Sequence, residues 1–446
     1  MKPVFLIGLC FLLVDISTLE GQRIWNLDQC LAYAWEHNLT VQAQTYDVKI
    51  RKTSYLQAAN NLLPTVTGQT SLDQYFGRSI DPGTNSYVDV QFLNNSYGIY
   101  SAVDVFSGFM KLNTLAMERQ LFHAEENELQ KIKNEVAFSV INGYFDVWLK
   151  EGLTAIAREN YQLSWNQRDY LVRLVEVGRK AGADLLEVEA NLAADSFLLV
   201  QSHHLLEEAT LGLKYQMNFP LSDTLPIDTT KVPDLTGNLD TLTMQSLFAL
   251  ASEALPDLKI AENQLNAAKK AVQISQGAFS PRIGFYSGWS SDYTSTMKDD
   301  QGRIIPFPDQ ISNNGSEYLS LGIEIPLFDR FSKYTSLKKY KLLYSQAKVK
   351  YNDEANKLKM GAEKSLTDWR SSRAEYVSAQ KQLAQSAKAF EAAQKKLDKG
   401  LISIIEFYIQ KNKVFRAKTE VLRTGLQVLL QERYIRFLMT GSWSAG

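Results

Sequence analysis

The sequence predicts a mixed α+β membrane protein in which a small number of β-strands are joined to unusually long helices. Three observations lead to this prediction. Prolines are missing from two long stretches of the 446-residue chain, four shorter segments alternate between apolar and polar residues, and the second half repeats the plan of the first. The charges are balanced, with 48 Lys and Arg against 49 Asp and Glu, so the composition gives no reason to expect nucleic acid as a partner.

Residues 1–21 have the features of a secretory signal peptide. Lys2 supplies a positive start, and residues 4–14 form an apolar run that is too short to span a bilayer as a mature helix. We therefore expect the chain to be exported and cleaved near the end of this segment. Cys10 lies within the apolar run, a poor context for lipidation, which stays open as an alternative. After cleavage only Cys30 remains, so no disulfide can form within the chain.

Long helices are permitted in the two stretches that lack proline, because proline breaks a helix interior. No proline lies between Pro82 and Pro220 or after Pro326. Apolar residues recur there at spacings of three and four, with charged residues between them. Each stretch predicts a helix of roughly 100 Å at 1.5 Å per residue, then a glycine-containing break and a second helix. The predicted helices are 108–177, 184–217, 331–399 and 406–439.

Four segments alternate with the period of a β-strand, and each is long enough to cross a bilayer obliquely. The clearest are 96–106 and 317–328, and weaker ones follow prolines at 64–76 and 281–293. In the clear pair one parity is apolar and is expected to face lipid, whereas the other carries Asp104 or Glu324 and small residues. A soluble sheet with one buried face would show the same alternation. The predicted lipid-facing residues are Ile99, Val103, Val105, Leu321, Ile323 and Ile325.

The number of strands predicts an oligomer. Known membrane barrels have at least eight strands, and an open sheet edge is not tolerated in lipid. Four strands from one chain therefore need strands from other copies. The segments between the paired strands, 77–95 and 294–316, are polar and rich in Asp, Gly, Ser and Asn, as expected for loops on the exterior face.

The chain reads as two copies of one plan, 22–217 and 242–440, joined by the proline-containing linker 218–241 and followed by the tail 441–446. Each copy is predicted to contain a helix, two strands, a long helix, a break and a last helix. The opening WNLDQCLAYAWEHN has a weaker counterpart in LTMQSLFALASEAL, and the strand end DVFSGF corresponds to PLFDRF. Both breaks share the pattern Gly-x-x-Ala/Ser-x-x-Asp/Glu. This duplicated order resembles the TolC-like outer-membrane efflux protein family over nearly all of the mature chain.

The resemblance implies a homotrimer in the outer membrane of a Gram-negative bacterium, in contact with outer-membrane lipid. A twelve-stranded β-barrel, with four strands per chain, would continue into a long α-helical barrel in the periplasm. The implied function is a passive channel of a tripartite efflux or export system, coupled to an inner-membrane transporter through a periplasmic adaptor protein. In the family the breaks form periplasmic tips where the adaptor docks. The matching residues are Gly178, Ala181, Asp184, Leu185, Gly400, Ser403, Glu406 and Phe407.

Other interpretations remain open for these features. The residues at the breaks also suit ordinary helix caps, since glycine permits unusual backbone angles and an acidic residue stabilises a first turn. The helices alone would also fit a periplasmic or surface coiled-coil structural protein, or an adaptor. We find no catalytic motif and no metal-ligand spacing; His203 and His204 lie about 100° apart on a helix and cannot readily share a metal. We expect no enzyme activity, no cofactor and no nucleic-acid partner.

Overall fold

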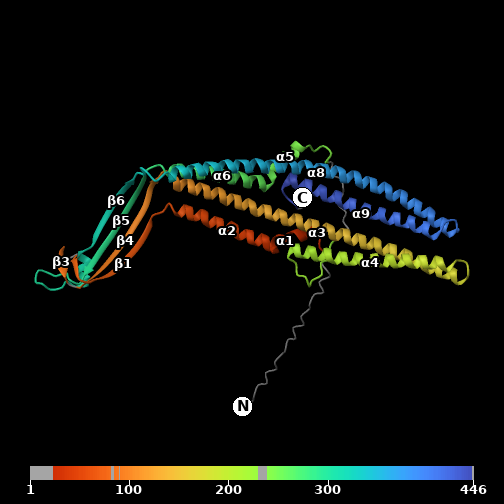
Figure 1. Cartoon of the computed structure of the whole chain (residues 1–446), viewed down its shortest axis with the longest axis horizontal. Helices are drawn as coiled ribbons and strands as arrows, with labels where there is room; N and C mark the ends of the chain where they lie inside the picture. The colour runs from red at the N-terminus through yellow and green to blue at the C-terminus, as the bar shows by residue number, and fades with distance from the viewer. Residues whose placement is uncertain (1–23, 82–84, 90, 230–238, 444–446) are drawn as a thin grey trace, which may run out of the picture.

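The computed structural model describes residues 24–81, 85–89, 91–229 and 239–443. Figure 1 shows an elongated chain in which a narrow sheet forms one end and long helices run from it to the other end. The predicted signal peptide and Cys10 lie outside the described residues, as does part of the predicted linker. No helix within the described ranges combines the length and the apolar character that a membrane span requires.

Two helices of 67 residues each, α3 (Met110–Glu176) and α8 (Ser332–Asp398), run most of the length of the chain. Each turns back into a shorter antiparallel helix, α4 (Gly182–Met217) or α9 (Ile404–Thr440), so that the far end consists of two helical hairpins. The four long-helix predictions are therefore confirmed, with boundaries that differ by only a few residues. The absence of proline and the spacing of apolar residues explain why these helices continue without a break.

Two shorter helices precede the strands in each half, where the sequence predicted one. They are α1 (Leu27–His37) and α2 (Leu39–Asn60), and α5 (Met244–Ala254) and α6 (Pro256–Gly277). Asn38 separates the first pair, because its side chain caps α2 by accepting from the Thr40 amide at 2.9 Å. Pro256 separates the second pair, since proline suits the first position of a helix. α1 and α5 have 11 residues each, and α2 and α6 have 22 residues each.

The shorter helices meet end to end beside the long ones. The Asn38 side chain donates to the Gln216 carbonyl at 2.9 Å, and the Asn218 side chain donates to the His37 carbonyl at 3.0 Å, so α4 ends where α2 begins. Gly441, with φ +69°, ends α9 against the carbonyl of Ala254, next to the start of α6. The main core lies around these two joints. Its fully buried members include Leu31, Ile141, Leu213, Leu247 and Ile435.

The sheet has four antiparallel strands in the order β1-β4-β5-β6. Their bounds are β1 (Thr65–Tyr75), β4 (Phe92–Ser107), β5 (Arg282–Thr294) and β6 (Ser316–Glu324). All four predicted strands are present. The predicted loops hold further structure, namely a small hairpin of β2 (Arg78–Asp81) and β3 (Ser86–Asp89) and the short helix α7 (Phe307–Asn313).

Two details of the predicted strands are wrong. The strand predicted to reach residue 328 ends at Glu324, because Glu324 pairs with Arg282, the first residue of β5, and Pro326 has no N–H to donate. Ile325 therefore lies outside the sheet. In β4 the register shifts between Asp104 and Phe106, which leaves Val105 as the extra residue of a β-bulge. A count of alternate residues therefore does not assign Val105 to a face.

The turns between sheet and long helices have the same geometry in both halves. Phe109 and Phe331, which precede α3 and α8, have left-handed backbones with φ of 58° and 61°. Each ring packs edge-to-face on a phenylalanine three residues earlier, with centroids 5.3 Å apart for Phe106 and 5.6 Å apart for Phe328. The related strand ends DVFSGF and PLFDRF thus build the same sharp turn.

Candidate functional site

The register of the sheet gathers four of the six predicted lipid-facing residues, namely Ile99, Val103, Leu321 and Ile323, on one surface, called here the outer face. Paired residues of an antiparallel sheet lie on the same side. Ile99 pairs with Trp289, and Phe285 pairs with both Val103 and Leu321. Most of these side chains are exposed, for example 65% of Leu321. The outer face includes Val66, Leu72, Ile99, Val103, Ile283, Phe285, Trp289, Leu319, Leu321 and Ile323.

The opposite, or inner, face carries hydroxyl and amide side chains together with tyrosines that cover glycines. A methyl group added at Gly98 would lie 2.5 Å from the Tyr100 hydroxyl, and one at Gly284 would lie 2.6 Å from the Tyr286 hydroxyl. The tyrosine rings therefore lie flat over positions that have no side chain. Asp104 belongs to this face and pairs with Lys111 at 2.8 Å. The alternating pattern predicted that this face carries small residues, but it did not predict that tyrosine rings cover the glycines. The only sign of this arrangement in the sequence is that a tyrosine follows each of these glycines two residues later.

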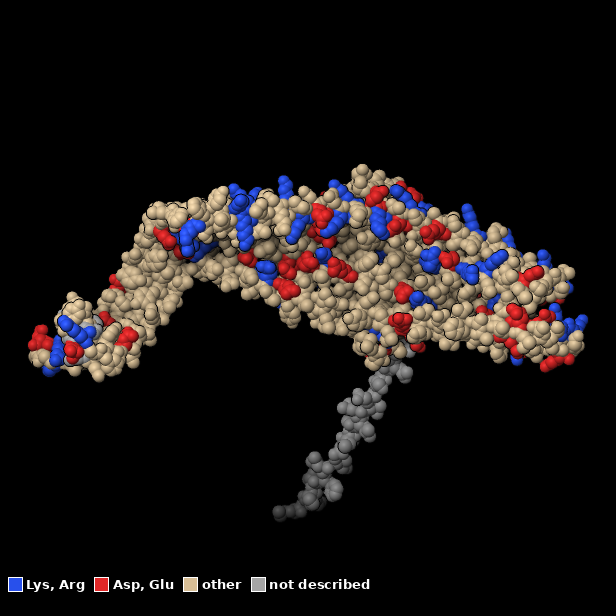
Figure 2. All heavy atoms as spheres, viewed as in Figure 1, with Lys and Arg blue, Asp and Glu red and all other residues tan. Residues whose placement is uncertain are grey.

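Charged residues of the four strands are confined to the two ends of the sheet. Asp73, Asp292 and Glu317 lie toward the end that carries β2 and β3, and Asp104, Arg282 and Glu324 lie toward the helices. The strand residues between these two sets carry no charge. Figure 2 shows a largely uncharged strip over the sheet, between the charged far end and the charged helices.

The two hairpin ends have the same backbone structure. Gly178 and Gly400 have φ of +71° and +70°, and the next residue donates to a carbonyl five residues back, at 2.8 Å from Arg179 and 2.9 Å from Leu401. This is the hydrogen-bonding pattern that ends a helix at a left-handed glycine. No other heavy atom lies within 4 Å of a methyl group added at either glycine, so both positions are open to solvent.

The other predicted tip residues divide into caps, exposed charges and core. Ser403 caps α9 by accepting from the Glu406 amide at 3.2 Å, whereas the side chain of Ala181 makes no such bond. Asp184 lies in the first turn of α4, 3.9 Å from Lys180. Phe407, however, is 1% exposed.

Leu185 and Phe407 belong to a small core close to the hairpin ends. Phe407 packs on Phe390, with ring centroids 5.4 Å apart, and beside Leu171 and Val188. Phe407 was predicted to be a docking-tip residue, but its ring is 1% exposed and offers a docked partner no surface. Leu185 is partly buried against the same cluster. These two residues instead hold the hairpins against each other.

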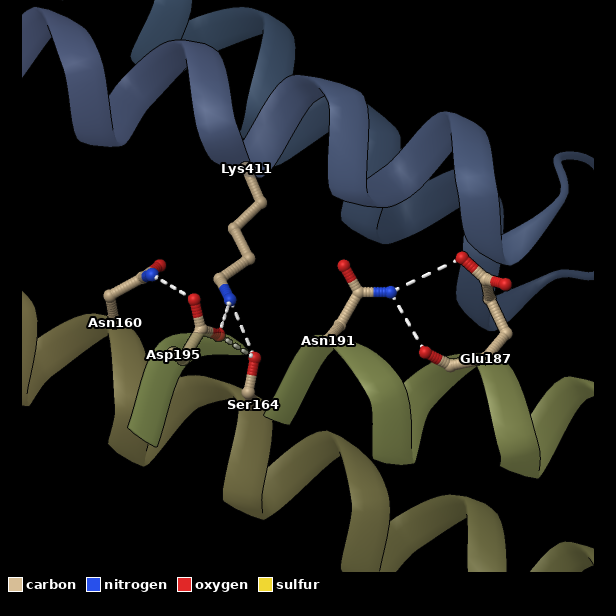
Figure 3. A network of polar contacts seen from close by, with 6 residues as sticks. All are labelled: Asn160, Ser164, Glu187, Asn191, Asp195 and Lys411. Carbon is tan, nitrogen blue, oxygen red and sulfur yellow. Dashed lines mark hydrogen bonds and ion pairs between the residues drawn. The ribbon is translucent and has the colours of Figure 1, made fainter. Parts of the chain in front are cut away.

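A buried polar network, which was not predicted from the sequence, lies one to two turns further from the ends (Figure 3). Lys411 of α9 reaches between α3 and α4 and donates to Asp195 and to Ser164, each at 2.5 Å. Asn160 donates to the second oxygen of Asp195 at 2.6 Å, and Ser164 also donates to Asp195. All four residues are more than nine-tenths buried. Desolvation lowers the pKa of Lys411, and Asp195 partly opposes this shift.

The network connects the two hairpins through charge rather than through packing alone. Lys411 follows Phe407 by four residues, so it lies on the buried face of α9. A lysine at this position is the one sign of the polar network in the sequence. Nearby, Asn191 donates to the carbonyl and the side chain of Glu187 within α4 (Figure 3). Within the described residues, no group of three or more His, Cys, Asp or Glu side chains is placed to hold a metal ion.

The chain thus combines a sheet that exposes one apolar face with two long helical hairpins, the features predicted from the sequence for an outer-membrane channel protein. Comparison with known proteins leads to the same class. Residues 247–441 match the family model described as outer membrane efflux protein. The solvent efflux pump outer membrane protein SrpC of Pseudomonas putida is 22% identical over 440 residues, which cover 94% of this chain and 86% of SrpC. The toluene efflux pump outer membrane protein TtgI of Pseudomonas putida matches equally well.

Solved structures share the fold over almost the whole chain. The outer-membrane channel OprN has a TM-score of 0.79 at 19% identity, covering 94% of this chain and 90% of OprN. The outer membrane protein VceC of Vibrio cholerae has a TM-score of 0.78 at 13% identity, covering 94% and 96%. Residues 247–441 thus resemble the outer membrane efflux protein family, and the chain shares the fold of solved outer-membrane channels over almost its whole length. The relatives named here are outer-membrane proteins.

Proposed function

We propose that three copies of the chain close a twelve-stranded barrel and form a passive efflux conduit across the outer membrane. Within the described part of a single chain, β1 and β6 are the edges of the sheet and have no strand partner on one side. Unpaired backbone groups in lipid cost several kcal/mol each, so the sheet is stable in a membrane only when other copies cover both edges. Pairing β6 of one copy with β1 of the next would do this.

The uncharged part of the sheet is the observation that carries the proposal. Asp292 follows Arg282 by ten positions along β5, which corresponds to about 33 Å at 3.3 Å per residue. Strands in membrane barrels tilt by roughly 35–45°, so this length covers about 25 Å of membrane, the height of the apolar band in such barrels. The inner face, with its hydroxyl groups, tyrosines and Asp104, would then line the channel.

The helical part supports a conduit that continues through the periplasm to a partner system. Helices of about 100 Å are long enough to bring the hairpin ends far from the outer membrane. We propose that these ends, at Gly178 and Gly400, meet a periplasmic adaptor that connects the channel to an inner-membrane transporter. Substrate choice and energy would come from those partners. The family and the fold are those of channel proteins rather than enzymes.

The assembled protein is expected to be a trimer that needs detergent. Closure of the barrel requires three sets of four strands, and its outer face must stay covered by lipid or detergent. Native mass measurement of the protein in detergent should give three chains per particle. A stable monomer in buffer without detergent would contradict the proposal and favour a soluble coiled-coil protein.

Bulky residues at Gly178 and Gly400 should reduce export while the trimer still assembles. Phenylalanine at these exposed positions would obstruct a docked adaptor, and a Cβ added at either glycine has no other atom of the chain within 4 Å. The measurement is export in cells, with cross-linking to the adaptor and trimer yield in the same membranes.

Alanine at the same two positions is the matched control, because it introduces the same left-handed strain without the bulk. The alanine variants should export much better than the phenylalanine variants. Normal export and cross-linking by the phenylalanine variants would mean that the breaks are only helix caps.

A further inference from the structure

The segment between β5 and β6 is ordered, although residues 294–316 were predicted to be a polar loop. The last residue of β5 that pairs with β6 is Ser290, and α7 packs against the remaining end of β5, which runs to Thr294. Gln310, fully buried, takes the place of a strand there: its side chain donates to the Thr294 carbonyl at 3.0 Å and accepts from the Thr294 amide at 2.9 Å. Asn314 donates to the Asp292 carbonyl at 2.7 Å. These bonds hold α7 in a fixed position on the sheet.

α7 lies on the outer face of the sheet rather than over the channel side. Ser291, which belongs to the outer face through its pairing with Tyr97, donates to the Ile311 carbonyl at 2.7 Å. Phe307 packs on two tyrosines of the same face, with ring centroids 6.0 Å from Tyr97 and 5.4 Å from Tyr293. The helix therefore continues the apolar surface outward beyond the ends of the lipid-facing strands.

The composition of this surface is that of a membrane–water boundary. Trp289, Tyr97, Tyr293 and Phe307 collect at one level, and aromatic side chains are enriched where a membrane protein meets the headgroups. The level is close to Asp292, at the outer end of the uncharged part of the sheet. Phe307 nevertheless remains 42% exposed, so its ring has room for a further contact.

We propose that α7 with the preceding Pro306, called the α7 shelf, rests in the headgroup layer of the outer leaflet, with Phe307 toward the lipid. This inference rests on the proposed barrel. The occupant is a lipid surface because the shelf continues the face that the barrel presents to lipid. A neighbouring subunit would be met at the sheet edge beside β6, whereas Phe307 lies over the outer face. Asp309, about 200° from Phe307 around the helix, faces water.

Spin labels at single cysteines in the reconstituted trimer test the shelf. The native Cys30 is fully buried, and burial raises the pKa of its thiol to about 12, so it stays protonated and reacts slowly with the label. The labelled variants are Phe307→Cys and, as matched control in the same helix, Asp309→Cys. Leu321→Cys marks the lipid-facing sheet. Collision with oxygen, which concentrates in lipid, is compared with collision with a water-soluble nickel chelate in phospholipid vesicles.

We expect the label at 307 to favour oxygen and to resemble the label at 321, while the label at 309 favours the nickel chelate. If 321 favours oxygen but 307 matches 309, the shelf is in water and the inference fails while the barrel stands. If 307 is immobile and shielded from both reagents, a protein neighbour covers it and the inference fails too. If the label at 321 itself favours the nickel chelate, the barrel proposal fails, and the α7 shelf proposal, which rests on it, fails too.

Discussion

Replacing Asp195 with alanine should destabilise the end of the second hairpin by about 3–5 kcal/mol, the usual result of leaving one buried charge without its partner. In this variant the Lys411 ammonium would remain between α3 and α4 with Ser164 as its hydrogen-bonding partner. The region has only a small apolar core to compensate, built around Phe407 and Tyr408. Hydrogen exchange of the first turns of α9 measures the effect as a lower free energy of local opening.

Two control variants make this test specific to the buried pair. Glu159 of α3 and Lys418 of α9 form an ion pair at 2.6 Å that joins the same two hairpins, but in an exposed position. Glu159→Ala should therefore cost only about 0–1 kcal/mol. The double variant Asp195→Leu with Lys411→Met replaces both charges with apolar groups and should recover most of the loss. Equal exchange in Asp195→Ala and Glu159→Ala would show that the network does not hold the hairpins together.

Arginine at Leu321 should reduce trimer yield in membranes, at a cost of about 2–4 kcal/mol if the side chain lies near the bilayer midplane. Leu321 is on the outer face, where it pairs with Phe285. The neighbouring Ser320 is on the inner face and pairs with Tyr286. Arginine at Ser320 would point into the wet channel and should be tolerated much better.

Ser320 is a better control than Gly322, although Gly322 has the same parity. A methyl group at Gly322 would lie 3.3 Å from the Tyr286 ring, so a large residue there would also displace the tyrosine. The yields of Leu321→Arg and Ser320→Arg are compared by blotting unboiled membrane samples. Equal yields, or a lower yield for Ser320→Arg, would mean that the two faces are assigned the wrong way round.

Local patterns were enough to predict the long helices and the strands. Proline-free stretches with helical spacing led to α3 and α8, and period-two alternation led to β4 and β6, because each pattern follows from the geometry of one element. The glycines of the two breaks were also predictable, since Gly178 and Gly400 take backbone angles that other residues avoid. The functional class followed from the order and duplication of these elements.

Features that depend on contacts between distant segments were not predictable. Lys411 meets Ser164 across 247 positions of sequence, and neither residue indicates the other. The bulge at Val105 leaves no trace in the alternation, because only the register with β5 shows the extra residue. α7 was missed because it is held by Gln310 and Asn314 rather than by its own apolar pattern.

The end-to-end joints of the shorter helices give the chain two lengths that evolution can change separately. The first length is the distance from the joints at Asn38 and Pro256 to the sheet. The second length is the distance from the same joints to the hairpin ends. Removing 11 residues from both arms of each hairpin would keep the helical phase and shorten the second length by about 16 Å. Relatives in periplasms of different width could thus differ in the length of the hairpins between the joints and the hairpin ends, while the sheet and the joints stay the same.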